Sequence, residues 1–221
     1  MKVDLGNLKS GTLRGKSGIF TLPVTTSASD KCVIVVGSQG VGENPLPKEV
    51  NGIMINEDVS SLIFLQASAL PSANQKSFFN VPNTFDSPDL LGWYEIIYED
   101  GFKTIVPIQY GRNALEWNAA HKKVRETITS GSMSTQSVYC YDADAIDCSA
   151  DPAQEPVSAF AFEWMNPRLG KIVKQVNLHG SINFQALLPE FEEPLTKPME
   201  SNAILLLAIS KVKKRERNKQ L

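Results

Sequence analysis

The chain has 221 residues, of which 42% are hydrophobic, 8% aromatic and 21% charged. This composition is close to the average for globular proteins and excludes a collagen-like, coiled-coil or wholly disordered chain. The formal net charge is −2, but residues 211–221 hold six basic residues and one acidic residue, which leaves 16 basic and 23 acidic residues in the remainder. An acidic body argues against nucleic acid as a partner, because phosphate binding needs clustered Lys and Arg on a folded face.

The sequence shows neither a membrane-spanning segment nor the pattern of a secretory signal. Its longest uninterrupted apolar run, residues 203–209, has seven residues, whereas a membrane-spanning helix needs about 20. The first residues lack the apolar stretch of a secretory signal. We therefore expect no membrane partner, and either an intracellular protein or an internal piece of a longer, exported chain. We also expect one domain over residues 1–210 and a disordered basic tail over residues 211–221.

Short segments rich in β-branched and aromatic residues alternate with clusters of Gly, Pro, Asn, Asp and Ser, which is typical of strands and their connections. In chain order, the expected strands are residues 18–24, 32–36, 60–67, 93–99, 103–108, 138–141, 157–164, 172–178 and 203–209. Only residues 112–126 have helix-like spacing of apolar residues. Strands without alternating helices exclude repeated βαβ units, because parallel neighbours need long crossovers. The sequence predicts an all-β, antiparallel β-sandwich or jelly roll with at most one short helix.

The clearest local prediction is a β-hairpin over residues 92–108. Asp100 and Gly101 form a favoured pair for a two-residue turn, in which both residues have positive φ. Alternation along the first strand places Tyr94, Ile96 and Tyr98 on one face, which we expect to be the core face. Pro107 has no amide donor, so the second strand is expected to lie at an edge or to bulge there.

No complete catalytic motif occurs. The chain has no Gly-x-Ser-x-Gly elbow, and the glycine-rich residues 36–42 lack the Gly-Lys-Ser/Thr ending of a phosphate-binding loop. Its carboxylates are too scattered to indicate a glycosidase pair. We therefore expect a protein that is not an enzyme. The rival hypothesis of a small β-rich, glycoside-active enzyme requires His121 to cluster with Glu116 or Asp100 in a deep cleft.

The three cysteines do not indicate a zinc site, because no Cys-x-x-Cys pair occurs. Cys140 and Cys148 can close a small loop in an oxidising compartment. Free structural cysteines are the preferred interpretation, and Cys32 lies in a pattern typical of a buried strand, where a thiol behaves as a small hydrophobe. The redox compartment stays undecided.

Residues 141–147 contain three closely spaced carboxylates, Asp142, Asp144 and Asp147. Calcium prefers such oxygen ligands, but the glycine and the distant glutamate of an EF-hand loop are missing. We therefore expect a plain acidic turn and no cofactor, with a calcium site as the alternative.

The best candidate for a ligand site directly follows the hairpin. A sugar ring needs a flat apolar surface under its C–H face and polar groups for its hydroxyls, and residues 108–118 combine aromatic, amide, carboxylate and guanidinium side chains. The candidate ligand-binding residues are Tyr110, Arg112, Asn113, Trp117 and His121. A second interpretation stays open, in which Trp117 plugs the end of the sandwich while Arg112 pairs with a local carboxylate.

Several segments also carry a family resemblance: residues 60–67, 92–101, 106–113, 162–171 and 203–210. In strand sequence and order they resemble galactose-binding-like β-sandwich modules, over roughly residues 50–210. Such modules often accompany the catalytic domains of bacterial glycoside hydrolases and related polysaccharide-degrading proteins. The resemblance implies carbohydrate binding through loops at one end, or packing on a neighbouring domain. A structural calcium is common in that family, but no calcium ligand carries over residue by residue.

We therefore expect a non-catalytic carbohydrate-binding or accessory module of a larger sugar-degrading protein. Its partner would be a carbohydrate or an adjacent catalytic domain, while the oligomeric state and the identity of the sugar stay open. The alternative from another class is a structural or interaction module without a ligand of its own. An exposed apolar patch around Trp93 or Trp117 would favour that alternative.

Overall fold

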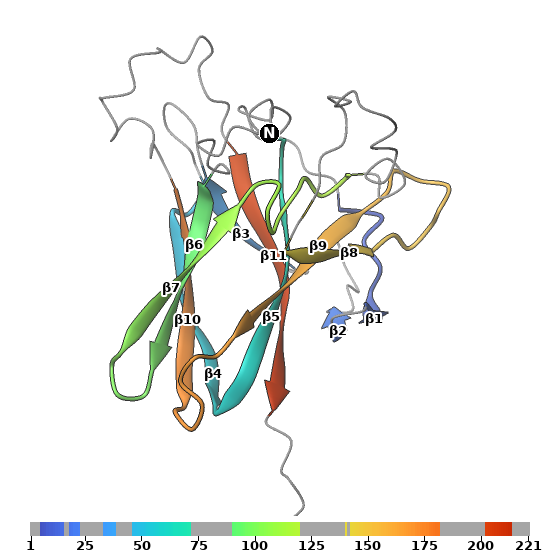
Figure 1. Cartoon of the computed structure of the whole chain (residues 1–221). Coiled ribbons are helices and arrows are strands. Elements are labelled where there is room, and N and C mark those ends of the chain that lie inside the picture. Colours follow the sequence, from blue (N-terminus) through green and yellow to red (C-terminus); the bar gives the residue numbers. More distant parts are fainter. Residues whose placement is uncertain are drawn as a thin grey trace, which may run out of the picture.

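The structure, a computed structural model, describes residues 5–15, 18–22, 33–38, 46–71, 90–119, 140, 142–181 and 202–213. These residues form eleven strands and no helix, and every pairing between the strands is antiparallel (Figure 1). The expected all-β, antiparallel sandwich is thereby confirmed. In this part of the chain no helix is present that could cross a membrane.

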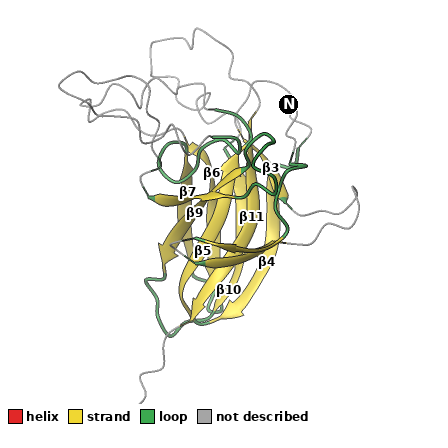
Figure 2. Ribbon diagram, turned by 90° about the vertical axis from the view of Figure 1, so that its right-hand side faces the viewer, coloured by secondary structure: helices red, strands yellow, loops and turns green. Residues whose placement is uncertain are grey.

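Two sheets form the layers of the sandwich (Figure 2). The four-stranded sheet has the order β4 (Glu49–Glu57), β10 (Val173–Gly180), β6 (Leu90–Tyr98), β7 (Lys103–Gln109). The five-stranded sheet has the order β3 (Ile34–Ser38), β11 (Asn202–Lys213), β5 (Val59–Ser68), β9 (Ser158–Met165), β8 (Ala143–Asp147). A separate pair consists of β1 (Gly11–Arg14) and β2 (Ile19–Leu22), and Ser210 Oγ of β11 donates a 3.0 Å hydrogen bond to the Ile19 carbonyl.

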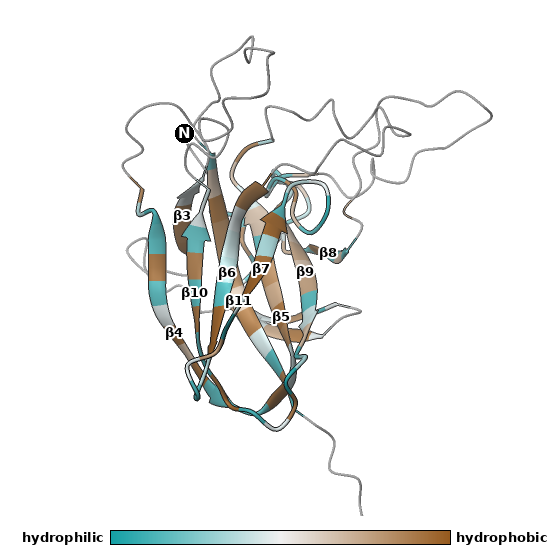
Figure 3. Ribbon diagram, turned by 60° about the vertical axis from the view of Figure 1, so that its left-hand side comes forward, coloured by the Kyte–Doolittle hydropathy of each residue, from teal (hydrophilic) through white to brown (hydrophobic). Residues whose placement is uncertain are grey.

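The core lies between the two large sheets. In Figure 3, hydrophobic residues (brown) alternate with hydrophilic residues (teal) along β4 and β10, because one face of each strand points toward this core and the other toward solvent. Tyr94, Ile96 and Tyr98 are all fully buried, so the predicted core face of β6 is confirmed. The ring of Tyr94 stacks on that of Phe64 from β5, with 3.9 Å between centroids.

Buried polar atoms in the core find partners across the sandwich. The Tyr94 hydroxyl donates a 2.6 Å hydrogen bond to Gln66 Oε1, and the Tyr98 hydroxyl donates one of the same length to Asn166 Oδ1. An unpartnered buried hydroxyl would cost roughly 1–3 kcal/mol. These two bonds therefore fix how the four-stranded sheet sits on the five-stranded sheet.

The predicted hairpin is present as β6 and β7, but its turn differs from the expected two-residue type. The amide of Gly101 donates to the Tyr98 carbonyl at 3.0 Å, and the amide of Tyr98 donates to the Phe102 carbonyl at 2.9 Å. Gly101 has a φ of 82°, whereas Asp100 is not among the described residues with positive φ. The loop is therefore residues 99–101, in which only Gly101 needs the left-handed region. β7 is an edge strand, as Pro107 predicts.

Three strands were not expected: β1, β4 and β8. β4 contains Gly52, whose φ is 79°, and the pairing of β4 with β10 shifts its register beside this glycine. Because such a bulge interrupts the alternation of apolar and polar residues, the sequence of this edge strand has only a weak strand pattern. The expected strand at 138–141 lies largely outside the described residues. In place of the acidic turn, residues 143–147 form β8, which pairs with β9.

Candidate functional site

The segment after β7, residues 110–119, is held against the sandwich by main-chain hydrogen bonds. The Trp117 amide donates to the Ser68 carbonyl at 2.9 Å, and the Ser158 amide donates to the Trp117 carbonyl at 2.5 Å. These bonds tie the segment to the ends of β5 and β9. The short helix that the sequence allowed does not form over residues 112–119, which form turns and isolated bridges, and residues 120–126 lie outside the described part.

Asn113 explains why this segment turns instead of forming a helix. Its Oδ1 accepts a 2.8 Å hydrogen bond from the Gln109 amide, and its Nδ2 donates a 2.9 Å bond to the Pro107 carbonyl. Such bonds from a side chain to nearby main chain compete with helix formation. Asn113 is 3% exposed. The side chain therefore shapes the loop, and the structure does not present it to a ligand.

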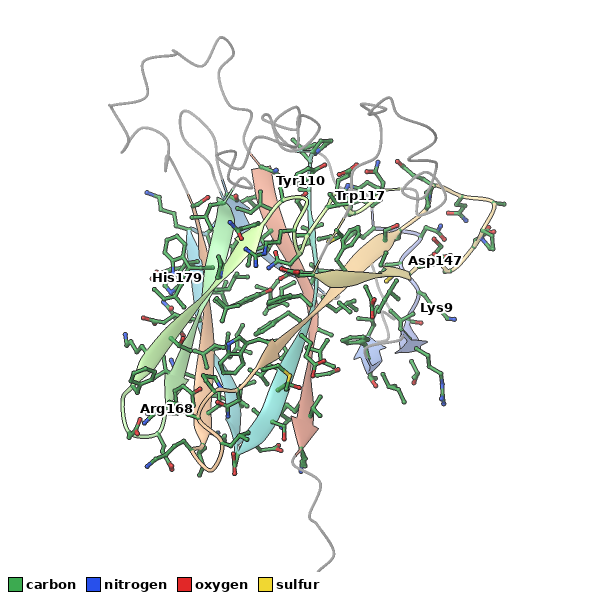
Figure 4. All side chains as sticks on the ribbon, viewed as in Figure 1. Lys9, Tyr110, Trp117, Asp147, Arg168 and His179 are labelled. Atoms are coloured by element: carbon green, nitrogen blue, oxygen red, sulfur yellow. The ribbon has the colours of Figure 1, made fainter. Side chains whose placement is uncertain are left out.

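The other candidate ligand residues separate into buried and exposed groups. Tyr110 is fully buried and Trp117 is 7% exposed, so both belong to the core at this end of the sandwich (Figure 4). Arg112 is exposed, and its Nε donates to Asp142 Oδ2 at 2.5 Å. These contacts agree with the second interpretation, in which Trp117 packs into the end of the sandwich and Arg112 pairs with a carboxylate. His121 lies outside the described residues.

A cavity of about 460 Å³ opens beside Trp117. Its wall includes three apolar residues that follow β5, and four residues from two further segments, 116–118 and 155. The lining residues are Ala69, Leu70, Pro71, Glu116, Trp117, Asn118 and Glu155. The cavity therefore joins an indole, an amide and two carboxylates from parts of the chain that are far apart in sequence.

Both carboxylates in this lining are oriented by neutral donors. The Tyr110 hydroxyl donates to Glu116 Oε2 at 2.5 Å, and Asn118 Nδ2 donates to Glu155 Oε1 at 2.9 Å. Tyr110 is thus a positioning residue for the cavity, although it does not line it. Sequence reasoning missed Glu155, because no motif connects it to residues 108–118.

The loop that carries Glu155 is itself anchored by Asn7, which is 7% exposed. Asn7 Nδ2 donates to the carbonyls of Asp151 at 3.0 Å and Glu155 at 2.9 Å, and the Asp151 amide donates to Asn7 Oδ1 at 2.8 Å. An N-terminal residue therefore sets the position of one cavity wall.

The three aspartates considered for calcium do not form a cluster. Asp144 and Asp147 lie on β8 three positions apart, so their side chains point to opposite faces of the strand. Asp142 is occupied by Arg112, and Asp147 Oδ1 accepts a 2.9 Å hydrogen bond from the Ser149 amide. Among the described residues, no group of three or more His, Cys, Asp or Glu side chains could hold a metal ion.

Cys140 and Cys148 are free thiols in the structure. Burial raises the pKa of Cys148 to about 12, with a smaller contribution from the charge of Asp147, and burial also raises the pKa of Cys140 well above its usual range. A thiol with a raised pKa is a poor nucleophile. The preferred interpretation of structural cysteines agrees with this geometry, and Cys32 lies outside the described residues.

Comparison with known protein families, curated proteins and solved structures finds no match to this chain. The resemblance to galactose-binding-like modules therefore stays a prediction from the sequence.

Proposed function

We propose that the chain is a non-catalytic carbohydrate-binding or accessory module of a larger sugar-degrading protein, and that the cavity beside Trp117 is its ligand site. The observation that carries this proposal is the lining itself, which combines apolar side chains with two pre-oriented carboxylates and an amide. Small-ligand sites combine a mostly apolar wall with a few fixed polar groups in this way.

The chemistry of the lining suits a polyhydroxylated ligand. Carboxylate oxygens accept hydrogen bonds from hydroxyl groups, and Glu116 and Glu155 each have one oxygen already fixed by a neighbour. Ala69, Leu70 and Pro71 supply apolar surface for C–H groups. The volume of about 460 Å³ falls within the usual range for small-ligand pockets.

Trp117 has a different role in this proposal from the one expected from the sequence. With 7% of its surface exposed, it can form part of the wall but cannot offer its whole face to a sugar ring. The gain from stacking is therefore small, and polar contacts carry most of the recognition. We expect dissociation constants on the order of 0.1–1 mM.

The test is retention of the full chain on a glycan array, followed by affinity electrophoresis of Asn118→Ala with the best glycan. Removing the Asn118 amide frees Glu155, so we expect retention to fall several-fold while the melting temperature stays within about 2 °C of wild type. A matched control is Asn51→Ala, because exposed Asn51 Nδ2 donates in the same way to Glu49 Oε1 at 2.9 Å. Equal retention of both variants, or an array without any bound glycan, would overturn the proposal.

A second candidate function is an interaction module that packs on a neighbouring domain. The outer face of the four-stranded sheet favours it, because Trp93 stacks on His179 there with 5.4 Å between ring centroids, while Ile105 and Met54 on the same face are 65% and 55% exposed. Single exposed apolar residues are common, so the informative feature is that three large apolar side chains share this face. This candidate predicts a blank glycan array and protection of Ile105 from solvent in a longer protein.

A further inference from the structure

We propose that the cavity beside Trp117 selects saccharides that carry free, protonated amino groups, and that it disfavours uronic acids. This inference rests on the proposed function and names its ligand class. It follows from the two carboxylates in the lining and from the neutral groups that donate hydrogen bonds to them.

The two carboxylates of the cavity lack the ion pairs that five other acidic side chains of the described residues make. Five acidic side chains there are in ion pairs with Lys, Arg or His: Glu49, Glu57, Glu95, Asp100 and Asp142. Glu116 and Glu155 accept their hydrogen bonds from a tyrosine hydroxyl and an asparagine amide, which are neutral. Within the described part of the chain, neither of them is in an ion pair. Among the described residues, the fold therefore orients these two groups with neutral hydrogen-bond donors and without an ion pair.

The described lining residues also include no basic side chain. The lining residues in the described chain are three apolar residues, one tryptophan, one asparagine and the two glutamates. A ligand that enters therefore meets two negative groups and no Lys, Arg or His side chain from this lining. An ammonium group gains a charge-assisted hydrogen bond there, which is roughly twice as strong as a neutral one.

Solvent limits the size of this preference. Glu116 is half-buried and Glu155 is exposed, so water screens both charges. We expect a preference of about tenfold for an amino sugar over its N-acetylated form, whose amide is neutral but similar in shape. A uronate is repelled by both glutamates and is expected to bind more weakly than the neutral sugar.

The test compares three ligands on the full chain by isothermal titration calorimetry near neutral pH. The ligands are a tetrasaccharide of glucosamine, the same tetrasaccharide fully N-acetylated, and a tetrasaccharide of galacturonic acid. We expect the first to bind about tenfold more tightly than the second, and the third to bind most weakly. High salt should reduce the preference for the first, because it screens charge interactions.

Isosteric variants locate the preference. Glu116→Gln and Glu155→Gln remove one charge each, and we expect each to lower the preference about threefold, while the double variant binds the free and N-acetylated sugars equally. Glu163→Gln is the matched control, because Glu163 on β9 also accepts a hydrogen bond from a neutral hydroxyl, that of Ser61 at 2.5 Å, yet does not line the cavity. This control should keep the wild-type preference.

The outcomes separate the two proposals. Equal affinity of the wild type for the free and N-acetylated sugars, tighter binding of the uronate, or a preference that survives in the double variant would overturn selection by charge while leaving carbohydrate binding intact. Absence of binding for all three ligands, together with a blank glycan array, would overturn the proposed function as well.

Discussion

Gly180 of β10 lies directly against the main chain of Gly37 in β3, so the two sheets meet there without side chains between them. A Cβ atom on Gly180 would lie 1.8 Å from the Gly37 carbonyl oxygen and 3.2 Å from Val36 Cγ1. Because main chain cannot move aside as a side-chain tip can, we expect Gly180→Ala to lower the free energy of unfolding by about 2–3 kcal/mol. Urea denaturation of the variant measures this loss.

Gly18→Ala is the control for that prediction. The nearest atom to a Cβ on Gly18 is the flexible end of Ile63, Cδ1 at 3.1 Å. A small shift of this side chain makes room, and alanine also restricts the unfolded chain, so the change in stability should stay within about 1 kcal/mol. If both variants were equally stable, the contact between Gly180 and Gly37 would not constrain how closely the sheets pack.

Trp117→Ala is expected to destabilise the protein, because the side chain belongs to the core. With 7% of the residue exposed, truncation to alanine leaves a large void, and we expect a loss of about 3–5 kcal/mol in the free energy of unfolding, measured with urea. Trp117→Phe should cost less, since it keeps an aromatic ring in the same place. A variant that keeps its stability but loses retention on a glycan would instead identify the indole as a binding platform.

The strands with strong apolar patterns could be predicted from the sequence, whereas those formed mainly by pairing could not. The expected strand at 60–67 is observed as Val59–Ser68, whose residues are nearly all buried. β8 has only Ile146 as a large apolar residue among its alternating Ala and Asp, and it is a strand because β9 pairs with it. Local composition therefore indicated a turn where the fold has an edge strand.

Three of the candidate ligand residues predicted from the sequence are buried in the fold. Residue types alone could not show that Tyr110, Asn113 and Trp117 point into the protein, because the same aromatic and amide groups serve cores and binding sites alike. Glu155 reaches the cavity only because the fold brings it to Asn118, from which it is separated by 37 positions in sequence. Such a pairing leaves no local pattern.

Removal of divalent cations tests the calcium alternative. Asp142 is paired with Arg112, and Asp144 and Asp147 point to opposite faces of β8, so these three carboxylates do not converge on an ion. We expect the melting temperature to change by less than about 1 °C when EDTA is added and when calcium is then restored. A fall of several degrees that calcium reverses would contradict this prediction, and Asp144→Asn would then show whether β8 contributes a ligand.

Acid should weaken the end of the sandwich at which Arg168 lies (Figure 4). Hydrogen bonds from the Arg168 guanidinium, with a further bond from the Phe102 amide, lower the pKa of Asp100 from its ordinary 3.8 to about 2. The same guanidinium lies over the rings of Tyr98 and Phe102, at 4.8 and 4.4 Å from their centroids. Asp100 therefore holds the cation that packs on both rings.

The direction of the pH effect follows from this lowered pKa. The folded state binds the Asp100 proton less readily than the unfolded state, so its contribution to stability is fully present above pH 3.8 and is lost as the pH falls through about 2. We expect Asp100→Asn to be less stable than wild type at neutral pH and to lose less stability across this acid range. Melting temperatures at a series of pH values measure both slopes. The melting temperature of the variant should still fall somewhat in acid, because the pKa values of Glu57 and Glu95 are also lowered. If the melting temperatures of the two proteins changed in parallel with pH, the bond between Asp100 and Arg168 would contribute nothing to folding.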